Sequence, residues 1–296
     1  MSYSLENWMK NVPDEKNIFE LNIPGTHDCV TQFVQLSHFA KCQNKSIYSQ
    51  LCCGVRALDI RVESRKRRLK MVHGITKAFN KPSHFSKQMD FGDVILHIKK
   101  FLAENPSEAV IIQFKNDSRR EEERCFDILY NEYIKKEPGL FFTQNRVPRM
   151  GEVRSKIYLI RRCRADFSKG EYNENESGLD FSRWVEQDTI SPDSKTLCTQ
   201  NAAGDAFVIY DRFKYKPKPR WENLILPTLE SARPFCGEYI INYLSTSGGV
   251  AGPERNAQYI NPKFLNYPLK KENYYGTIYA DFADCELCRK IIDLNF

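Results

Sequence analysis

The chain has 296 residues, of which 41% are hydrophobic and 28% are charged, and its formal net charge is +6. This composition is typical of a globular protein, and no apolar run is long enough to span a bilayer. The excess of 44 basic over 38 acidic residues is small and dispersed. It does not indicate nucleic-acid binding, although it suits a phosphate-bearing substrate or an anionic surface.

The N-terminal segment, residues 1–16, lacks the basic stretch followed by an apolar one that a secretory signal requires. We therefore expect a cytoplasmic or peripheral membrane protein, or the processed form of a secreted one. No pattern in the chain predicts a protein partner.

Eight apolar runs of strand length follow in chain order, and several are rich in β-branched or aromatic residues. They are residues 19–23, 56–61, 69–73, 109–115, 157–162, 207–212, 239–245 and 277–282. After the first run, Pro24 and Gly25 predict a sharp exit of the chain. Thr26 or Asp28 is placed to cap whatever element follows.

Helical patterns separate many of these runs. They are GDVILHIKKFLAENP (92–106), EEERCFDILYNEYIKKEPG (121–139), RWENLILPTLESA (220–232) and ADCELCRKIIDLNF (283–296). Strands that alternate with helices favour a parallel α/β fold, and eight of them predict an irregular TIM-like (β/α) barrel. No repeat or linker divides the chain, so we expect a single domain over residues 1–296.

The carboxyl ends of the strands in such a barrel converge on one mouth. Nearly every predicted strand ends in a polar group, most of them ionisable, and scattered surface charges would not follow the strand ends so regularly. In chain order these groups are His27, Arg61, His73, Lys115, Arg162, Asp211, Asn242 or Ser245, and Asp281.

One connection does not fit a regular barrel. Only residues 62–68 join the second and third strands, whereas a parallel crossover usually needs a dozen or more residues. Either the barrel is irregular there, or the pair is an antiparallel hairpin and His73 does not share the mouth. The same region holds the basic run 65–70, which we interpret as a solvated loop in preference to a contact with anionic phospholipid.

The polar groups at the mouth are suited to cleavage of a phosphodiester by an internal hydroxyl. One histidine serves as base and the other as acid, while cations neutralise the phosphate. Side chains alternate along a strand, so Asp59 and Arg61 lie on the same face of the second predicted strand. The guanidinium of Arg61 therefore fills the position where a second metal ligand would have to lie. We therefore predict catalysis without a metal or cofactor.

Ten cysteines stand at irregular spacings: 29, 42, 52, 53, 125, 163, 198, 236, 285 and 288. The single C-x-x-C at Cys285 and Cys288 has no second pair to complete a zinc site. Without a secretory signal, we expect free thiols.

Several motifs together resemble the catalytic X domain of the bacterial-type phosphatidylinositol-specific phospholipases C. In order, they are NIPGTHD, SIYSQLCCGVRALDIRV, MVHG, VILHIKKFLAENPSEAVIIQFK, IYLIRR and IYDRFKY. The likeness covers a core of about residues 15–290. It implies cleavage of phosphatidylinositol, or of a glycosylated form of it (GPI), to diacylglycerol and inositol 1,2-cyclic phosphate.

The resemblance also implies roles for five residues. His27 matches the general base that activates the inositol 2-hydroxyl, and Asp281 matches the carboxylate that orients it. His73 matches the general acid that protonates the diacylglycerol oxygen, and Asp28 matches its carboxylate partner. Arg61 matches the arginine that stabilises the pentacoordinate phosphorus and marks the metal-independent members.

Four further residues match positions that contact the inositol ring. Lys115, Arg162 and Asp211 correspond to groups that bind its hydroxyls. Phe213 stands where many members have a stacking tyrosine, so the hydroxyl contact of that tyrosine is missing.

Alternatives remain at two positions and for the function as a whole. Asp28 competes with a simple role as helix cap, and Asp284 competes with Asp281 as the partner of His27. Two other functions fit the pattern less well. One is an inositol-phospholipid binding module that has lost catalysis, and the other is a metal-dependent glycerophosphodiesterase on a similar barrel.

Overall fold

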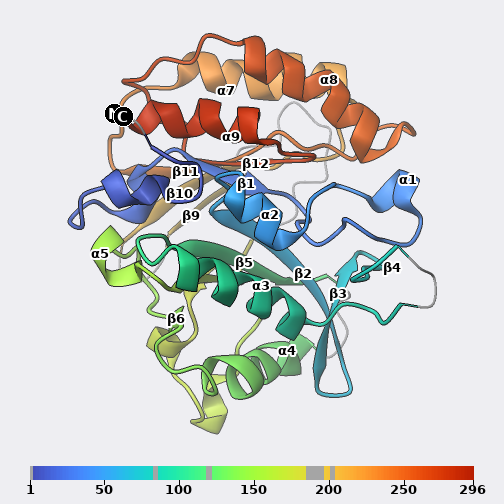
Figure 1. Cartoon of the computed structure of the whole chain (residues 1–296), viewed down its shortest axis with the longest axis vertical. Helices are drawn as coiled ribbons and strands as arrows, with labels where there is room; N and C mark the ends of the chain where they lie inside the picture. Colours follow the sequence, from blue (N-terminus) through green and yellow to red (C-terminus); the bar gives the residue numbers. More distant parts are fainter. Residues whose placement is uncertain (1–2, 83–85, 118–121, 185–196, 201–203) are drawn as a thin grey trace.

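The computed structural model describes residues 3–82, 86–117, 122–184, 197–200 and 204–296 (Figure 1). Its strands form one curved sheet with the order β6-β7-β5-β2-β1-β12-β11-β10-β9. The strands on this path are β6 (Phe141–Phe142), β7 (Ile157–Arg161), β5 (Val110–Asn116), β2 (Ala57–Arg65), β1 (Ile23–Thr26), β12 (Thr277–Ala280), β11 (Glu238–Tyr243), β10 (Ala206–Tyr210) and β9 (Leu197–Gln200). Off the path lie β3 (Arg68–His73), β4 (Thr76–Lys77) and β8 (Leu179–Asp180).

Parallel pairing runs from β6 through to β10, and only β9 is antiparallel at the end of the path. Among the described residues no pairing joins β9 to β6, so the strands curl into a half-barrel that stays open. The expected irregular parallel α/β barrel is thereby confirmed. Because the strands are parallel, their carboxyl ends meet on one face of the molecule.

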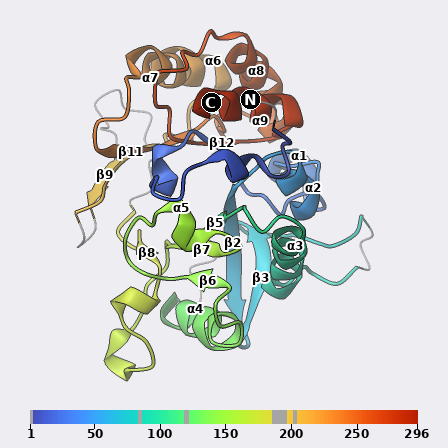
Figure 2. The same ribbon diagram turned by 60° about the vertical axis from the view of Figure 1, so that its left-hand side comes forward.

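Helices cover the outside of the curved sheet. Figures 1 and 2 show α7, α8 and α9 gathered over one part of it, with α3 and α4 at the opposite end of the molecule. The helices are α1 (Ser37–Ala40), α2 (Ile47–Cys52), α3 (Phe91–Glu104), α4 (Glu122–Leu129), α5 (Met150–Val153), α6 (Pro217–Arg220), α7 (Leu226–Ser231), α8 (Gly252–Asn266) and α9 (Cys285–Ile292). None of the described helices has the length and apolar character needed to cross a membrane.

The first predicted strand is wrong in position. Residues 18–20 form a 3₁₀ turn, and β1 begins at Ile23, so Pro24 and Gly25 lie inside the strand and do not end it. A Cβ atom on Gly25 would come within 2.9 Å of the Tyr279 ring, so only glycine lets β1 approach β12 this closely. The next described helix begins only at Ser37, so neither Thr26 nor Asp28 acts as a cap.

The short connection between the second and third predicted strands is an antiparallel hairpin. Strand β2 continues to Arg65, the chain turns, and β3 returns with Met71 opposite Val62. The return carries His73 back to the level of the other strand ends, so the expectation that a hairpin would remove His73 from the mouth is wrong. The basic residues 65–68 are exposed at the hairpin tip.

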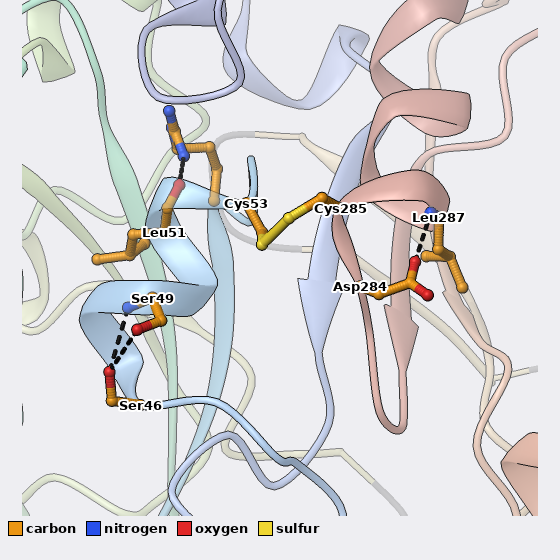
Figure 3. The surroundings of a disulfide bond; sticks show 8 residues. Ser46, Ser49, Leu51, Cys53, Asp284, Cys285 and Leu287 are labelled. Atoms are coloured by element: carbon orange, nitrogen blue, oxygen red, sulfur yellow. Dashed lines mark hydrogen bonds between the residues drawn. A yellow bond between two sulfur atoms is a disulfide. The ribbon is translucent and has the colours of Figure 1, made fainter.

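A disulfide joins Cys53, directly after α2, to Cys285 at the start of α9 (Figure 3). The expectation of free thiols is therefore wrong for these two residues, which are 232 positions apart in sequence. Helix α2 precedes β2 and α9 follows β12, the two neighbours of β1 in the sheet. Sequence spacing gave no signal for this pairing, because the fold alone brings the two helix ends together.

Candidate active site

Five of the predicted site residues converge on the face where the parallel strands end. His27 follows β1, Arg61 lies in β2, His73 ends β3, and Asp281 follows β12. Asp28 is buried beside His27. Four of these side chains, all but Asp28, line a cavity of about 190 Å³ together with Phe39, Cys42, Arg162, Asp211, Phe213, Ser245, Thr246, Ser247, Gly249, Gly252 and Pro253.

His27 is held from both sides of its ring. Its Nδ1 lies 2.7 Å from Oδ1 of Asp281, and its Nε2 lies 3.1 Å from Oδ2 of Asp28 and 2.9 Å from Nη2 of Arg61. Burial alone would lower the pKa of His27, but Asp281 and Asp28 outweigh burial and raise the pKa to about 9. The Nδ1 contact fixes the ring orientation and leaves Nε2 facing the cavity side.

The backbone conformation of Asp28 directs its side chain toward His27, His73 and Arg61. Asp28 adopts a left-handed conformation with φ of 43°, which aspartate tolerates better than most residues. Its fully buried carboxylate lies 3.1 Å from Nε of Arg61 and 3.3 Å from Nε2 of His73. One carboxylate therefore contacts both histidines and the arginine, which a helix cap would not do.

Arg61 is fixed by acidic neighbours on two strands. Its guanidinium lies 3.0 Å from Asp59 in β2 and 3.8 Å from Asp117, just beyond β5. Although burial opposes its charge, Asp28 and these two carboxylates hold the pKa of Arg61 well above its ordinary value. Burial raises the pKa of Asp59, but Arg61 and His27 outweigh it and lower the value to about 2. Arg61 thus stays charged beside His27.

His73 faces the same carboxylate from across the cavity. Its Nδ1 lies 2.9 Å from the backbone oxygen of Ala40, so Nδ1 carries a proton and donates it there. The other nitrogen, Nε2, is directed at Asp28. The rings of His27 and His73 lie 6.2 Å apart between centroids.

The remaining predicted residues lie further around the mouth. The guanidinium of Arg162 stacks 3.8 Å above the Trp184 ring, and Asp211 and Phe213 line the cavity. Burial is the largest influence on Asp211 and raises its pKa. Lys115 is not among the lining residues; its Nζ lies 3.0 Å from Asp117.

At two positions the sequence left a choice between two residues, and the structure places the two members of each pair differently. Asp281 contacts His27, whereas Asp284 accepts a hydrogen bond from the Leu287 amide and caps α9 (Figure 3). Ser245 lines the cavity, whereas the side chain of Asn242 donates to the Tyr275 carbonyl.

Sequence reasoning missed two residues of this site. Asp117 accepts a hydrogen bond from the Gly74 amide at 2.6 Å and contacts Arg61 and Lys115, so it ties the β3–β4 turn to β5. Its spacing of two from Lys115 was the available signal, because alternate residues of an extended segment share a face. Cys42 lies in the loop between α1 and α2 and had no signal at all.

The arrangement provides two histidines, each with a carboxylate partner, and an arginine between them. This is the equipment for moving one proton from a nucleophile and another to a leaving group across a phosphate. Among the described residues, one group has donor atoms close enough to hold a metal ion: His27, Asp28 and Cys42.

Comparisons with known proteins find similar sequences over the whole length of the chain. Residues 22–163 match the model of the family described as phosphatidylinositol-specific phospholipase C, X domain. The 1-phosphatidylinositol phosphodiesterase of Staphylococcus aureus (strain Newman) is 28% identical over 319 residues, covering 100% of this chain and 96% of that protein. The Listeria monocytogenes protein of the same name is 25% identical over 311 residues, covering 99% of this chain and 86% of the relative.

Solved structures support the same fold. A structure of the phosphatidylinositol-specific phospholipase C of S. aureus, from work on modulation of its membrane binding, matches with a TM-score of 0.79 at 25% identity and covers 99% of this chain and 98% of that one. The enzyme from L. monocytogenes matches with a TM-score of 0.73 at 23% identity, covering 99% of this chain and 100% of that one. The motifs, the half-barrel and these matches agree, and residues 22–163 belong to the phosphatidylinositol-specific phospholipase C X-domain family.

Proposed function

We propose that this chain, acting as a single domain over residues 1–296, cleaves phosphatidylinositol to diacylglycerol and inositol 1,2-cyclic phosphate. The observation that carries the proposal is the placement of His27 and His73 around Asp28 and Arg61, with ring centroids 6.2 Å apart. A phosphate bound between the two rings has a base on one side and an acid on the other. No step of the proposed reaction uses a metal or a cofactor.

The first step removes a proton from the inositol 2-hydroxyl. Nε2 of His27 accepts this proton, and the resulting alkoxide attacks the adjacent phosphorus. The imidazolium that forms is stabilised by Asp281, 2.7 Å from Nδ1. This contact also keeps the ring in the tautomer whose Nε2 is basic.

The second step expels diacylglycerol. His73 protonates the leaving oxygen through Nε2, which lies 3.3 Å from Asp28. Arg61 neutralises the charge that develops on the phosphate oxygens, and its contacts with Asp59 and Asp117 hold it in place before substrate arrives. Such preorganised charge costs no reorganisation during the reaction.

The inositol ring takes the part of the cavity lined by Arg162, Asp211 and Phe213. Lys115 does not line the cavity, so to reach a ring hydroxyl its Nζ has to leave Asp117, 3.0 Å away. A ring bearing several hydroxyls needs fixed donors and acceptors, and the two cations and one carboxylate supply both kinds. Phe213 offers a flat apolar face without a hydroxyl. The substrate is phosphatidylinositol itself or a form that carries a glycan on the inositol.

We also propose that the mouth rests on the membrane surface as a peripheral contact. Four of the large apolar side chains that are exposed stand next to cavity residues: Leu36, Phe39, Ile75 and Val250, with exposed fractions from 63% to 95%. Phe39 itself lines the cavity, and Ile75 follows His73 by two positions. Exposed apolar groups around a catalytic mouth are suited to contact with lipid.

A headgroup comparison tests the proposal. The protein is incubated with mixed micelles of detergent and phosphatidylinositol, and in parallel with phosphatidylcholine and with a glycosylated phosphatidylinositol. We expect water-soluble phosphate from phosphatidylinositol and none from phosphatidylcholine, because only an inositol ring carries the internal nucleophile. Release from neither inositol lipid would contradict the proposal, and release from the glycosylated form alone would correct the substrate.

A further inference from the structure

Cys42 is a thiol in the catalytic cavity for which the proposed reaction has no use. Its side chain is fully buried, and its Sγ lies 4.0 Å from Nδ1 of His73. Two backbone hydrogen bonds fix its position, one from its amide to the Thr31 hydroxyl at 2.9 Å and one from the Phe282 amide to its carbonyl at 2.6 Å. The sulfur is therefore held at the cavity wall by the fold.

The donor atoms of His27, Asp28 and Cys42 form a compact set. One ligand atom from each lies within 4.8 Å of the other two. Zinc binds nitrogen, oxygen and thiolate ligands at roughly 2.0–2.3 Å, which places the ligands of a tetrahedral site about 3.5 Å apart. Side-chain adjustments of about an ångström would bring the three donors to that spacing. An imidazole, a carboxylate and a thiolate together favour zinc over the hard cations calcium and magnesium.

We propose that Zn²⁺ binds to His27, Asp28 and Cys42 and thereby blocks the active site. His73 stands beside this set without being part of it: its Nε2 lies 3.3 Å from the same Asp28 oxygen that contacts His27. The effect on catalysis rests on the function proposed above, whereas the binding of zinc does not.

Arg61 is the main obstacle to a cation here, because its Nη2 lies 2.9 Å from Nε2 of His27. The zinc ion has to displace this contact. After displacement the guanidinium keeps Asp59, 3.0 Å away, and Asp117, 3.8 Å away, as partners. Asp28 and Asp281 remain beside His27, so the ion enters a cluster that retains negative charge.

The consequence for the enzyme is inhibition that competes with substrate. Zinc takes the lone pair with which His27 would accept the proton of the inositol hydroxyl, and it occupies the Asp28 carboxylate. The bound zinc ion cannot replace Arg61 in neutralising the phosphate, because it is bound to His27, the proposed base. A chelator should therefore restore activity to a zinc-treated sample without being needed by an untreated one.

Direct binding tests the site independently of activity. The full chain competes for zinc with a chromophoric chelator, and Cys42→Ser is compared with Cys29→Ser, a matched control in which another buried thiol near His27 is changed. We expect Cys42→Ser to weaken the tightest zinc affinity by at least ~10-fold and Cys29→Ser to change it by less than ~2-fold. Equal affinities in the two variants would overturn the proposal.

Two further measurements complete the test. One does not depend on the folding of a variant, and the other distinguishes failure of the zinc site from failure of the proposed lipid cleavage. Cobalt(II) added to the unmodified chain should give the absorption band of thiolate-to-metal charge transfer, and its absence would overturn the thiolate ligand. In the lipid assay, each variant is compared with its own zinc-free rate. Zinc binding without any lipid cleavage would contradict the proposed function and leave the site standing, whereas zinc-resistant cleavage would overturn the inhibition.

Discussion

Nδ1 of His27 and Oδ1 of Asp281 lie 2.7 Å apart although 254 positions separate the two residues in the chain. Strands β1 and β12 pair directly, with Thr26 opposite Ala280, so their following residues emerge side by side. The amide of His27 also donates to the Ala280 carbonyl at 3.1 Å. The sheet itself therefore positions His27, the proposed base, against the Asp281 carboxylate.

Replacing either of the two histidines proposed as base and acid should abolish most of the activity without unfolding the protein. We expect His27→Ala and His73→Ala to lower kcat by at least ~100-fold, because each removes a proton-transfer group. His97→Ala, which changes a histidine of α3 outside the cavity, is the matched control. Initial rates and circular dichroism provide the measurements, and a folded His27→Ala with normal turnover would refute the assignment.

The pH dependence of the reaction should report the Asp281 contact. His27 acts as a base only when neutral, and its pKa is raised to about 9, so kcat/KM should rise with pH on the acid side until His27 is neutral. Asp281→Asn removes a cause of the raised pKa and should shift this limb to lower pH, with a lower plateau because the imidazolium loses its partner.

Asp284→Asn is the control for that experiment. Asp284 caps α9 and does not contact His27, and asparagine is an equally good capping residue. Its pH profile should therefore overlay that of the unmodified protein. Identical profiles for the Asp281 and Asp284 variants would argue against Asp281 as the orienting carboxylate.

Lysine should not replace Arg61. The guanidinium contacts Asp28, Asp59 and Asp117 through three different nitrogens, whereas a lysine has a single charged nitrogen. We expect Arg61→Lys to lower kcat by ~100-fold or more while KM changes little, as for loss of a group that acts mainly in the transition state. Arg68→Lys, at the hairpin tip, is the control and should have the kcat and KM of the unmodified chain. If Arg61→Lys instead raises KM strongly and leaves kcat unchanged, Arg61 acts in substrate binding and not in the transition state.

The disulfide should stabilise the fold. Cys53→Ser is expected to lower the free energy of unfolding by about 2–4 kcal/mol under oxidising conditions, because the lost cross-link connects distant parts of the chain. Cys236→Ser, which changes an exposed free thiol, serves as control. Denaturant unfolding with and without a dithiol reductant measures the effect. A reductant that leaves the stability of the unmodified chain unchanged would contradict a stabilising role for the disulfide.

The general plan of the site was predictable because parallel strands must end on one face. His27, Arg61 and Asp281 lie near the ends of predicted strands, so their place at the mouth was predictable without any knowledge of contacts. The first strand was misplaced because Pro24 and Gly25 normally interrupt strands, and the reason for the glycine is the close approach of Tyr279 and Ala57 from the neighbouring strands. Local patterns cannot report a ring that arrives from β12.

The features that remained hidden depend on long-range geometry. The length of the β2–β3 hairpin decides whether His73 returns to the mouth. The charged residues at the hairpin tip form no pattern that shows where the chain turns. Cys42 reaches the cavity from an irregular loop, where no periodicity assigns a direction. The pairing of Cys53 with Cys285 likewise follows only from the neighbouring places of α2 and α9.

The identity of the first phosphorus-containing product tests the proposed reaction most directly. The protein is incubated with phosphatidylinositol micelles in excess chelator, and the reaction is followed by phosphorus NMR. We expect the resonance of a five-membered cyclic phosphate, which requires attack by the inositol 2-hydroxyl without a metal. Cleavage that appears only after calcium is added would contradict the role of Arg61, and direct formation of an acyclic inositol phosphate would contradict the internal nucleophile.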